Sequence, residues 1–171
     1  MAEVIIRRAD GSDADTLSAL AAHTFSDTFA HLYPPADLAA YVGAAYDPAV
    51  TRAELSAPRT AFWMMETDGK AIGYAMAGPC GLPHPDVTAR CGELKRIYLL
   101  RNFQGGGRGG RLLNLALGWL SENGFGTQWL GVWSENFGAQ RLYARLGFEK
   151  VGEYQFRVGE TLDREFIMRR G

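Results

Sequence analysis

Cysteine and histidine are scarce in this chain, and that scarcity narrows what the protein can be. The 171 residues include two cysteines and three histidines. Ten residues separate Cys80 from Cys91, so the two form no Cys-x-x-Cys motif, and the histidines form no recognisable ligand set with them. We therefore expect two free thiols, as in a reducing cytoplasm, and no metal site.

A positive charge excess and a long apolar run are also missing. The formal net charge is −1 at pH 7, whereas a nucleic-acid-binding protein usually carries a broad basic excess. The N-terminal segment Met1–Arg8 has no basic stretch followed by a long apolar one, and no segment is apolar over the length of a bilayer. We therefore expect no nucleic-acid partner, no membrane partner and a cytoplasmic location.

The remaining composition is that of an ordinary globular domain. Hydrophobic residues make up 47% of the chain and charged residues 22%, which is typical of a protein with a substantial core. A chain of 171 residues fits one domain, so we expect residues 1–171 to form a single domain that needs no disulfide or metal for stability.

Apolar periodicity and turn residues predict alternating strands and helices. Strands are expected over Val4–Arg8, Thr60–Thr67, Lys70–Ala77, Arg90–Leu100, Gln128–Trp133, Phe148–Phe156 and Leu162–Arg169. Helices are expected over Asp13–Phe29, Pro34–Ala45, Pro48–Ser56, Gly107–Asn123 and Asn136–Leu146. Ser12, with Asp15 three residues later, is expected to cap the first helix. This order predicts an α/β fold with a central, mixed, twisted β-sheet of about six to seven strands and helices on both faces.

The most informative segment is a glycine loop that follows the long fourth strand and opens a helix. Glycine occupies five of the six positions from Gly105 to Gly110. Such a loop leaves its backbone N–H groups unobstructed, and a helix N-terminus adds further N–H groups and the positive end of its dipole. From Lys95 to Arg111 there are five cations and no carboxylate. The segment therefore predicts an anion site, with a phosphate as the usual occupant.

Three kinds of phosphate loop compete for this segment. A Walker A loop needs Lys-Ser/Thr after its last glycine, but Arg111 and Leu112 follow Gly110. A dinucleotide-binding Gly-x-Gly-x-x-Gly pattern is present, with Glu135 downstream, but only one strand–helix–strand unit accompanies it, late in the chain. The third pattern is Gln104-x-x-Gly107-x-Gly109, placed directly between strand and helix.

This third pattern resembles the pyrophosphate loop of the GNAT N-acetyltransferase superfamily, Arg/Gln-x-x-Gly-x-Gly/Ala. Glu93–Leu99 is similar to that family's fourth strand, and Asn136-x-x-Ala139-x-x-x-Tyr143-x-x-x-Gly147-Phe148 is similar to its asparagine, helix, tyrosine and β-turn signature. Three further segments resemble bacterial spermidine/spermine N-acetyltransferases, and with them the resemblance covers essentially the whole chain. These segments are Thr24–Phe29, Trp129–Asn136 and Phe166–Arg169.

The resemblance implies transfer of an acetyl group from acetyl-coenzyme A to a small primary amine, with a polyamine as the expected acceptor. Coenzyme A is expected to contact residues of the fourth strand, the glycine loop and the next helices. These residues are Ile97, Tyr98, Leu99, Gln104, Gly105, Gly106, Gly107, Arg108, Gly109, Gly110 and Asn136. In the resembled family the fourth strand splays from its neighbour and pairs with the pantetheine arm, and a backbone N–H there polarises the thioester carbonyl.

The resemblance also implies catalytic roles. Tyr143 is the expected general acid, because a phenol is protonated at neutral pH and can protonate the departing thiolate. An amine with a pKa near 10 must lose a proton at pH 7, which costs about 4 kcal/mol. Glu93, acting through a water, is the expected base, and Glu135 or a chain of waters is the alternative. Asn136 is also expected to cap its helix.

The acceptor site is less defined by sequence. Phe25, Phe29 and Trp133 are expected to form its wall, with Tyr33 and Tyr41 as further candidates. Asp27 and Glu66 are carboxylates that could attract a cationic amine. Other acceptors (an amino acid, an antibiotic or a protein N-terminus) and a non-catalytic acyl-coenzyme A sensor stay open. Homodimers are common in the resembled family, although no surface signal in this sequence demands one.

Overall fold

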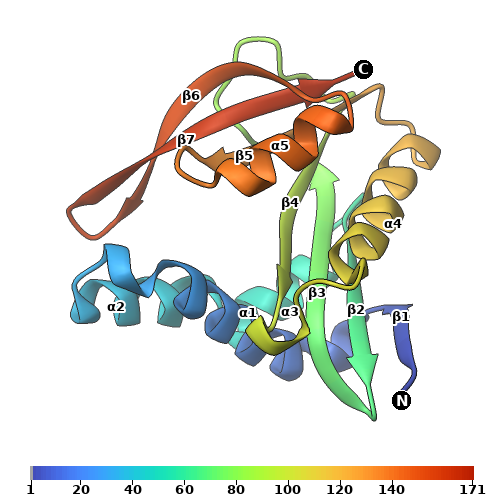
Figure 1. The fold of residues 1–171 in the computed structure, drawn as a ribbon, viewed down its shortest axis with the longest axis vertical. Coiled ribbons are helices and arrows are strands. Elements are labelled where there is room, and N and C mark those ends of the chain that lie inside the picture. Colours follow the sequence, from blue (N-terminus) through green and yellow to red (C-terminus); the bar gives the residue numbers. More distant parts are fainter. Residues whose placement is uncertain (1) are drawn as a thin grey trace.

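Seven strands form one mixed sheet in the computed structural model, which describes residues 2–171 (Figure 1). The strands are β1 (Val4–Arg8), β2 (Ala61–Thr67), β3 (Lys70–Pro79), β4 (Cys91–Leu99), β5 (Thr127–Trp133), β6 (Glu149–Val158) and β7 (Thr161–Arg170). Their spatial order is β1-β2-β3-β4-β5-β7-β6, and β4 and β5 are the one parallel pair among these residues. This confirms the predicted single-domain α/β fold with a mixed sheet.

Helices cover both faces of the sheet, as the sequence predicts. They are α1 (Ala14–Phe29), α2 (Pro35–Ala45), α3 (Pro48–Leu55), α4 (Arg108–Glu122) and α5 (Phe137–Arg145). Three single 3-10 turns precede α1, α2 and α4, namely η1 (Gly11–Asp13), η2 (Ala30–Leu32) and η3 (Arg101–Phe103). Within residues 2–171 no helix combines the length and apolarity needed to cross a bilayer.

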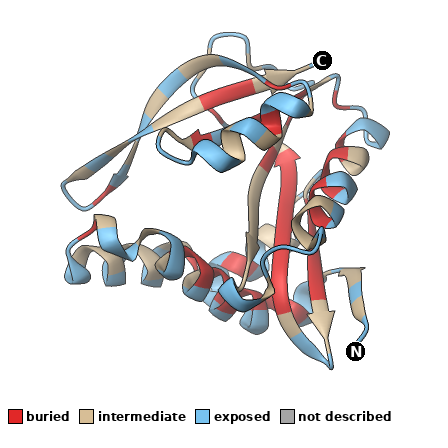
Figure 2. Ribbon diagram, viewed as in Figure 1, coloured by how far each residue is buried: buried red, intermediate tan, exposed pale blue. Residues whose placement is uncertain are grey.

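Each face of the sheet carries its own core. Under α4 and α5 the core is largely aliphatic and includes Leu112, Leu113 and Leu120, each at most 2% exposed. Under α1 to α3 it is rich in aromatic rings, among them Phe25 and Tyr74. The sheet is therefore buried on both sides, and Figure 2 shows β3 buried over nearly its whole length. Burying one such leucine contributes roughly 1.5–3 kcal/mol, so these clusters hold the helices in place.

The prediction that Ser12 caps the first helix is wrong. The chain inserts the 3-10 turn η1 before α1, and the cap moves upstream to Asp10, whose carboxylate accepts the Ser12 N–H at 2.8 Å. Asp13 completes the capping box by accepting the Asp10 N–H at 2.9 Å. Arg7 also donates to the Asp13 carboxylate, at 2.7 and 2.9 Å. The box is therefore tied to β1, which sequence spacing alone does not reveal.

The strand β4 carries a bulge at Lys95. On β3, Ala77 pairs with Leu94 and the adjacent Met76 pairs with Arg96, so Lys95 has no partner there. The bulge shifts the alternation of side chains by one residue. Leu94 and Ile97, three residues apart, consequently both pack in the core under α4, whereas Arg96 reaches Glu54 of α3 on the other face.

The strands β4 and β5 diverge after a short parallel contact. They pair over Cys91–Leu94 and Thr127–Leu130, so within the described residues Lys95–Leu99 has no strand partner on the β5 side. Beyond the contact, β5 continues in pairing with β7 through Trp133. Figure 1 shows β4 turning away from β5, β6 and β7. The resemblance implied this splay, and the backbone pairing now shows it.

Candidate active site

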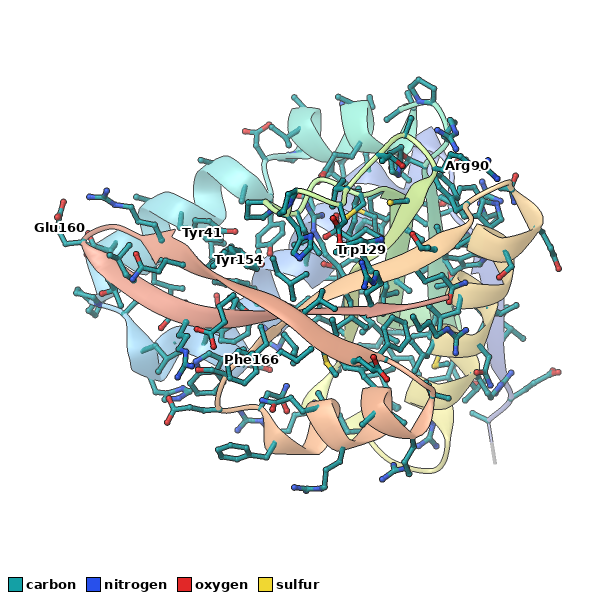
Figure 3. The ribbon with its side chains drawn as sticks, turned by 90° about the horizontal axis from the view of Figure 1, so that it is seen from above. Tyr41, Arg90, Trp129, Tyr154, Glu160 and Phe166 are labelled. Carbon is teal, nitrogen blue, oxygen red and sulfur yellow. The ribbon has the colours of Figure 1, made fainter. Side chains whose placement is uncertain are left out.

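A pocket of about 220 Å³ opens where β4 and β5 diverge. Its lining comes from α1, α2, β4, β5, α5 and the β6–β7 hairpin. Figure 3 shows Tyr41 of α2 and Tyr154 of β6, both lining residues, where the hairpin comes close to α2. Segments from the beginning, middle and end of the chain therefore meet in one cavity.

Many of the residues predicted from the sequence lie in this cavity. The lining includes Phe25, Phe29, Tyr33, Tyr41, Ile97, Tyr98, Trp133, Asn136 and Tyr143. Six predicted residues are not among the lining residues, namely Asp27, Glu66, Glu93, Leu99, Gln104 and Glu135. The glycine loop also lies outside the lining, at the start of α4.

Aromatic rings form the wall nearest α1. The ring centroids of Phe25 and Phe29 are 4.9 Å apart, and Phe29 meets Trp133 edge to face at 6.0 Å. Phe25 also contacts the ring of Tyr41 at 5.0 Å. Phe25 is only 3% exposed and belongs to the core under α1 to α3, so it serves both packing and the pocket wall.

Tyr143 presents a phenol to the pocket from α5. The residue is 8% exposed, and within residues 2–171 its hydroxyl makes no side-chain hydrogen bond. Its ring instead packs against Phe148, with centroids 5.9 Å apart. Burial raises the pKa of Tyr143 to about 12, because a buried phenolate loses its hydration. The hydroxyl is therefore protonated at neutral pH and has a proton to give.

Asn136 begins α5, as predicted. Its side-chain oxygen accepts the Ala139 N–H at 3.2 Å, and its own N–H donates to the Trp133 carbonyl at 3.0 Å. Gln140 donates to the same carbonyl at 3.1 Å. These bonds fix the turn between β5 and α5, so Trp133 and Tyr143 have a defined relative position.

Glu93 is engaged elsewhere. Its carboxylate accepts the Gly81 N–H at 3.0 Å and the Lys95 ammonium at 3.1 Å, and its side chain is 12% exposed. These contacts tie the segment after β3 to β4. Glu66, on β2, pairs with Arg7 at 3.0 Å.

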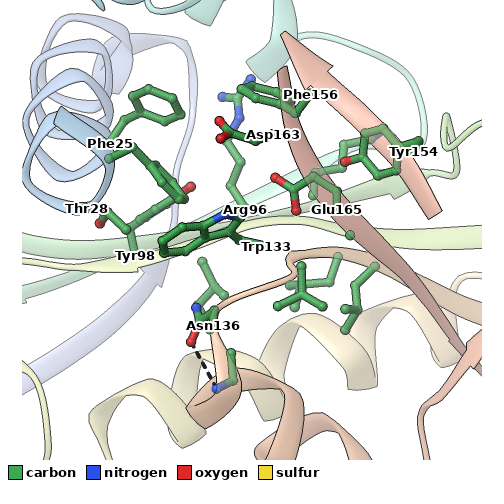
Figure 4. Close-up of a pocket in the computed structure, with 18 of the residues that line it drawn as sticks. Phe25, Thr28, Arg96, Tyr98, Trp133, Asn136, Tyr154, Phe156, Asp163 and Glu165 are labelled. Carbon is green, nitrogen blue, oxygen red and sulfur yellow. Dashed lines mark hydrogen bonds between the residues drawn. The ribbon is translucent and has the colours of Figure 1, made fainter. Parts of the chain in front are cut away.

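Sequence reasoning missed two carboxylates of the pocket, Asp163 and Glu165 on β7. Both line the cavity, and Figure 4 shows the Glu165 carboxylate between Trp133 and Tyr154. The Tyr33 hydroxyl donates to Asp163. Burial, with a smaller contribution from the Asp163 charge, raises the pKa of Glu165 to about 7. Two acidic residues at alternate positions of one strand were the available signal, because such positions share a face.

Arg96 lines the pocket, but the carboxylate of Glu54 neutralises its positive charge. Its guanidinium bonds to both carboxylate oxygens of Glu54, at 2.7 and 3.4 Å. Lys95, the other lining cation, pairs with Glu93. The cluster of five cations inferred from the sequence is therefore split, because Lys95 and Arg96 serve carboxylates on neighbouring elements.

The glycine loop has the backbone that an anion cradle requires. Gly105, Gly106 and Gly107 have φ values of +88°, +64° and +76°, which side chains rarely adopt. A Cβ at Gly109 or Gly110 would meet no atom closer than 3.7 Å, so internal packing does not require glycine there. Within residues 2–171 no backbone or side-chain acceptor takes the N–H of Gly107, Gly109 or Gly110. The free amides and open space fit a diphosphate.

Among residues 2–171, the two arginines beside the loop bond to no carboxylate. Arg108 bonds to the carbonyls of Phe103 and Gly105, and Arg111 to the carbonyl of Val4, all at 3.3–3.4 Å. Their charges, together with the N-terminus of α4, leave this corner positive. Within residues 2–171 no group of three or more His, Cys, Asp or Glu side chains is placed to hold a metal ion.

Sequence comparisons identify a family and several relatives. A model of the acetyltransferase (GNAT) family matches residues 22–148. An uncharacterized N-acetyltransferase of Mycobacterium tuberculosis is 35% identical over 157 residues, covering 92% of this chain and 96% of that protein. An uncharacterized N-acetyltransferase of Lactobacillus delbrueckii is 28% identical over 170 residues, covering 99% and 98%.

Solved structures share the fold. The PaiA N-acetyltransferase of Thermoplasma acidophilum, in complex with coenzyme A, superposes with a TM-score of 0.77 at 22% identity, covering 98% of both chains. The ribosomal-protein-S18-alanine N-acetyltransferase of Escherichia coli superposes with a TM-score of 0.66 at 20% identity, covering 98% of this chain and 92% of that one. At these identities the likeness concerns the fold.

Proposed function

Because this chain belongs to the GNAT acetyltransferase family, we propose that it acetylates a small primary amine, and that the acceptor is a polyamine. The protein is an acetyl-coenzyme A-dependent N-acetyltransferase. The finer assignment of the acceptor rests on the charge of the pocket.

The observation that carries the acceptor assignment is a surplus of negative charge in an aromatic cavity. Asp163 and Glu165 line the pocket, while its two cations are each paired with a carboxylate. Faces of aromatic rings also attract cations. The pocket therefore favours a cationic amine and disfavours an acceptor with its own carboxylate, such as a free amino acid.

Two carboxylates along one strand suit an acceptor with more than one amino group. Residues two apart on a strand lie about 7 Å apart on the same face. This separation is close to that of neighbouring nitrogens in a polyamine. The Tyr33 hydroxyl donates to Asp163 and so fixes the position of that carboxylate on the pocket wall.

The donor side of the site combines the loop and the open edge of β4. Gly105, Gly107, Arg108 and Gly109 donate backbone N–H groups to the diphosphate of coenzyme A in this proposal, and Gln104, Gly106 and Gly110 complete the loop. Each charge-assisted hydrogen bond contributes roughly 1.5–3 kcal/mol before ordering costs. The N-terminus of α4 supplies further attraction.

The reacting end of the donor lies between β4 and α5. Ile97, Tyr98 and Leu99 offer backbone groups on the edge that β5 leaves unpaired, and one of these N–H groups polarises the thioester carbonyl. Asn136 contacts the donor while capping α5. Tyr143 acts as general acid and protonates the departing sulfur.

The proposal also includes a cytoplasmic location and a homodimeric state. The two free thiols, Cys80 and Cys91, are in keeping with a reducing compartment.

A thiol-release assay over a panel of amines tests the function. The panel contains spermidine, spermine, diamines of three to five carbons, monoamines of matched length, free amino acids and a peptide with a free N-terminus. We expect kcat/KM to be largest for the polyamines and at least about tenfold lower for the matched monoamines, since these lose one charge pair. A preference for amino acids or peptides would refute the acceptor assignment. Binding of acetyl-coenzyme A without thiol release for any amine would identify a sensor instead.

A further inference from the structure

Glu165 is a pocket carboxylate with no partner of its own. Within residues 2–171 no hydrogen-bond donor and no cation is bonded to its side chain, which is half-buried. The other carboxylates near the pocket are engaged. Asp163 accepts the Tyr33 hydroxyl, Glu93 accepts Gly81 and Lys95, and Glu54 holds Arg96. Glu165 is therefore the carboxylate that is free to exchange a proton.

The strand register places Glu165 on the face of the sheet that lines the pocket. On β5 its partner is Trp133, and on β6 its partner is Tyr154. Directly paired residues project to the same face of a sheet, so Glu165 lies between these two rings (Figure 4). Trp133 immediately precedes the turn that begins α5, and Tyr143 of α5 lines the same pocket. A carboxylate and a phenol therefore share one cavity from separate elements.

We propose that Glu165 is the catalytic base that takes the proton from the reacting ammonium group of the acceptor. This assignment rests on the proposed acetyl transfer. The acceptor enters as a cation, and its N–H bond breaks while the Glu165 carboxylate binds the proton. The freed nitrogen lone pair forms the C–N bond as the C–S bond of the thioester breaks.

Tyr143 and the solvent exchange the remaining protons of the reaction. Tyr143 gives its phenolic proton to the sulfur, and it is reprotonated by the second proton that the acylated nitrogen loses. Glu165 returns its proton to solvent. The sum is one amide, one thiol and one released proton from one ammonium and one thioester.

The groups around Glu165 favour this role. On β7, Asp163 is its nearest like charge. The other groups around it are phenols from β6, from the α1–α2 side and from β4, namely Tyr154, Tyr33, Tyr41 and Tyr98. The β4 cation Arg96 is neutralised by Glu54. A base is most effective when its pKa lies near the working pH, and burial among these rings brings the pKa of Glu165 to about 7.

Kinetic and binding measurements on Glu165→Gln test the assignment. In the wild type, kcat/KM should fall about tenfold per pH unit below pH 7, because the protonated base cannot accept a proton. The Gln variant should lose this acidic limb, and its kcat/KM at pH 8 should be at least about 100-fold lower. Glu165→Asp should keep the limb at reduced rate. Glu160→Gln, on the exposed turn between β6 and β7, is the matched control and should behave as wild type.

A donor-free readout separates a base from a structural residue. Spermidine is titrated into the enzyme at pH 7 by calorimetry, in two buffers of different ionisation enthalpy. Wild-type enzyme should release about half a proton per site at this pH, since a cation binds the ionised carboxylate and half of the sites start protonated. Glu165→Gln should release none.

The outcomes distinguish the two proposals. Unchanged pH profiles in a folded, active Glu165→Gln variant would overturn the base assignment and leave acetyl transfer intact. Loss of the acidic limb in Glu93→Gln instead would overturn it in favour of Glu93. A wild-type protein that releases no thiol with any amine would overturn acetyl transfer and this assignment together.

Discussion

The hydroxyl oxygen of Tyr154 lies 2.7 Å from the position that a Cβ atom would occupy on Gly131. Both residues line the pocket, Gly131 from β5 and Tyr154 from β6. Because Gly131 has no side chain, the phenol of Tyr154 can occupy this position next to Glu165.

Gly131→Ala should displace Tyr154 and reduce kcat/KM for the amine by about tenfold, because misplaced pocket residues degrade substrate alignment. The added methyl group meets the far end of a side chain that can shift, so the melting temperature should change little. The double variant Gly131→Ala/Tyr154→Phe removes the contacted hydroxyl and should recover part of the loss. Gly43→Ala on α2, where a Cβ meets nothing within 4 Å, is the control. No recovery in the double variant would show that the contact does not position the pocket.

Gly107→Glu should weaken coenzyme A binding by at least about 100-fold in calorimetry, since the variant places a carboxylate where the diphosphate is proposed to bind. The φ of +76° at Gly107 adds strain for any side chain, roughly 1–2 kcal/mol. Gly124→Glu controls for this strain, because Gly124 follows the other end of α4 with a φ of +84° and open space around it. Equal coenzyme A affinity in both variants would rule out the loop as the diphosphate site.

Tyr143→Phe should lower turnover at least about tenfold while leaving coenzyme A affinity unchanged. The pKa of Tyr143 is raised to about 12 by burial, so the phenol is protonated throughout the accessible range and the loss should be the same at pH 6 and pH 9. The melting temperature should stay near that of the wild type, because the deleted hydroxyl makes no side-chain hydrogen bond within residues 2–171. Wild-type turnover in this variant would remove Tyr143 from the mechanism.

Asp13→Ala should lower the free energy of unfolding by about 1–2 kcal/mol at pH 7. The variant loses the capping bond to Asp10 and the bonds to Arg7; because the Arg7 side chain is 40% exposed, solvent weakens the ion pair and the cap carries most of the loss.

Hydrogen bonds from Arg7 lower the pKa of Asp13. This contribution is therefore present above the ordinary Asp value of about 3.9 and is lost as the pH falls through the lower folded value. Denaturant titrations should show the difference between variant and wild type shrinking below about pH 4. Asp15→Ala, at a carboxylate 81% exposed, should change the free energy by less than about 0.5 kcal/mol. A difference that stays constant to pH 2 would contradict the ion-pair account.

Local patterns in the sequence were sufficient for the elements and for the unusual backbone of the glycine loop. Apolar periodicity placed the helices and strands to within a few residues, and the glycines of the loop marked its special backbone. The 3-10 turns η2 and η3 were missed, because three residues are too few to show a period. The prediction of Ser12 as the cap failed because Asp13 is drawn to Arg7 of β1, a contact that only the fold creates.

The position of Glu165 in the pocket depends on strand pairing that no local pattern encodes. Glu165 faces the pocket because β7 lies between β5 and β6 and pairs Trp133 with Glu165. A shift of one residue in that register would turn Glu165 to the opposite face. In the same way, the bulge at Lys95 places Arg96 on the face of the sheet where Glu54 lies, opposite the face covered by α4.

The brief parallel contact between β4 and β5 has a mechanical consequence. Four residue pairs, from Cys91 with Thr127 to Leu94 with Leu130, connect two parts of the sheet. One part consists of β1 to β4 and the other of β5, β7 and β6. Within each of these two parts, neighbouring strands pair antiparallel over five or more residue pairs. The backbone pairing across this contact is therefore the shortest in the sheet, so the core under α4 and α5, which includes Leu94 on one side and Leu130 on the other, holds the two parts together beside the cavity.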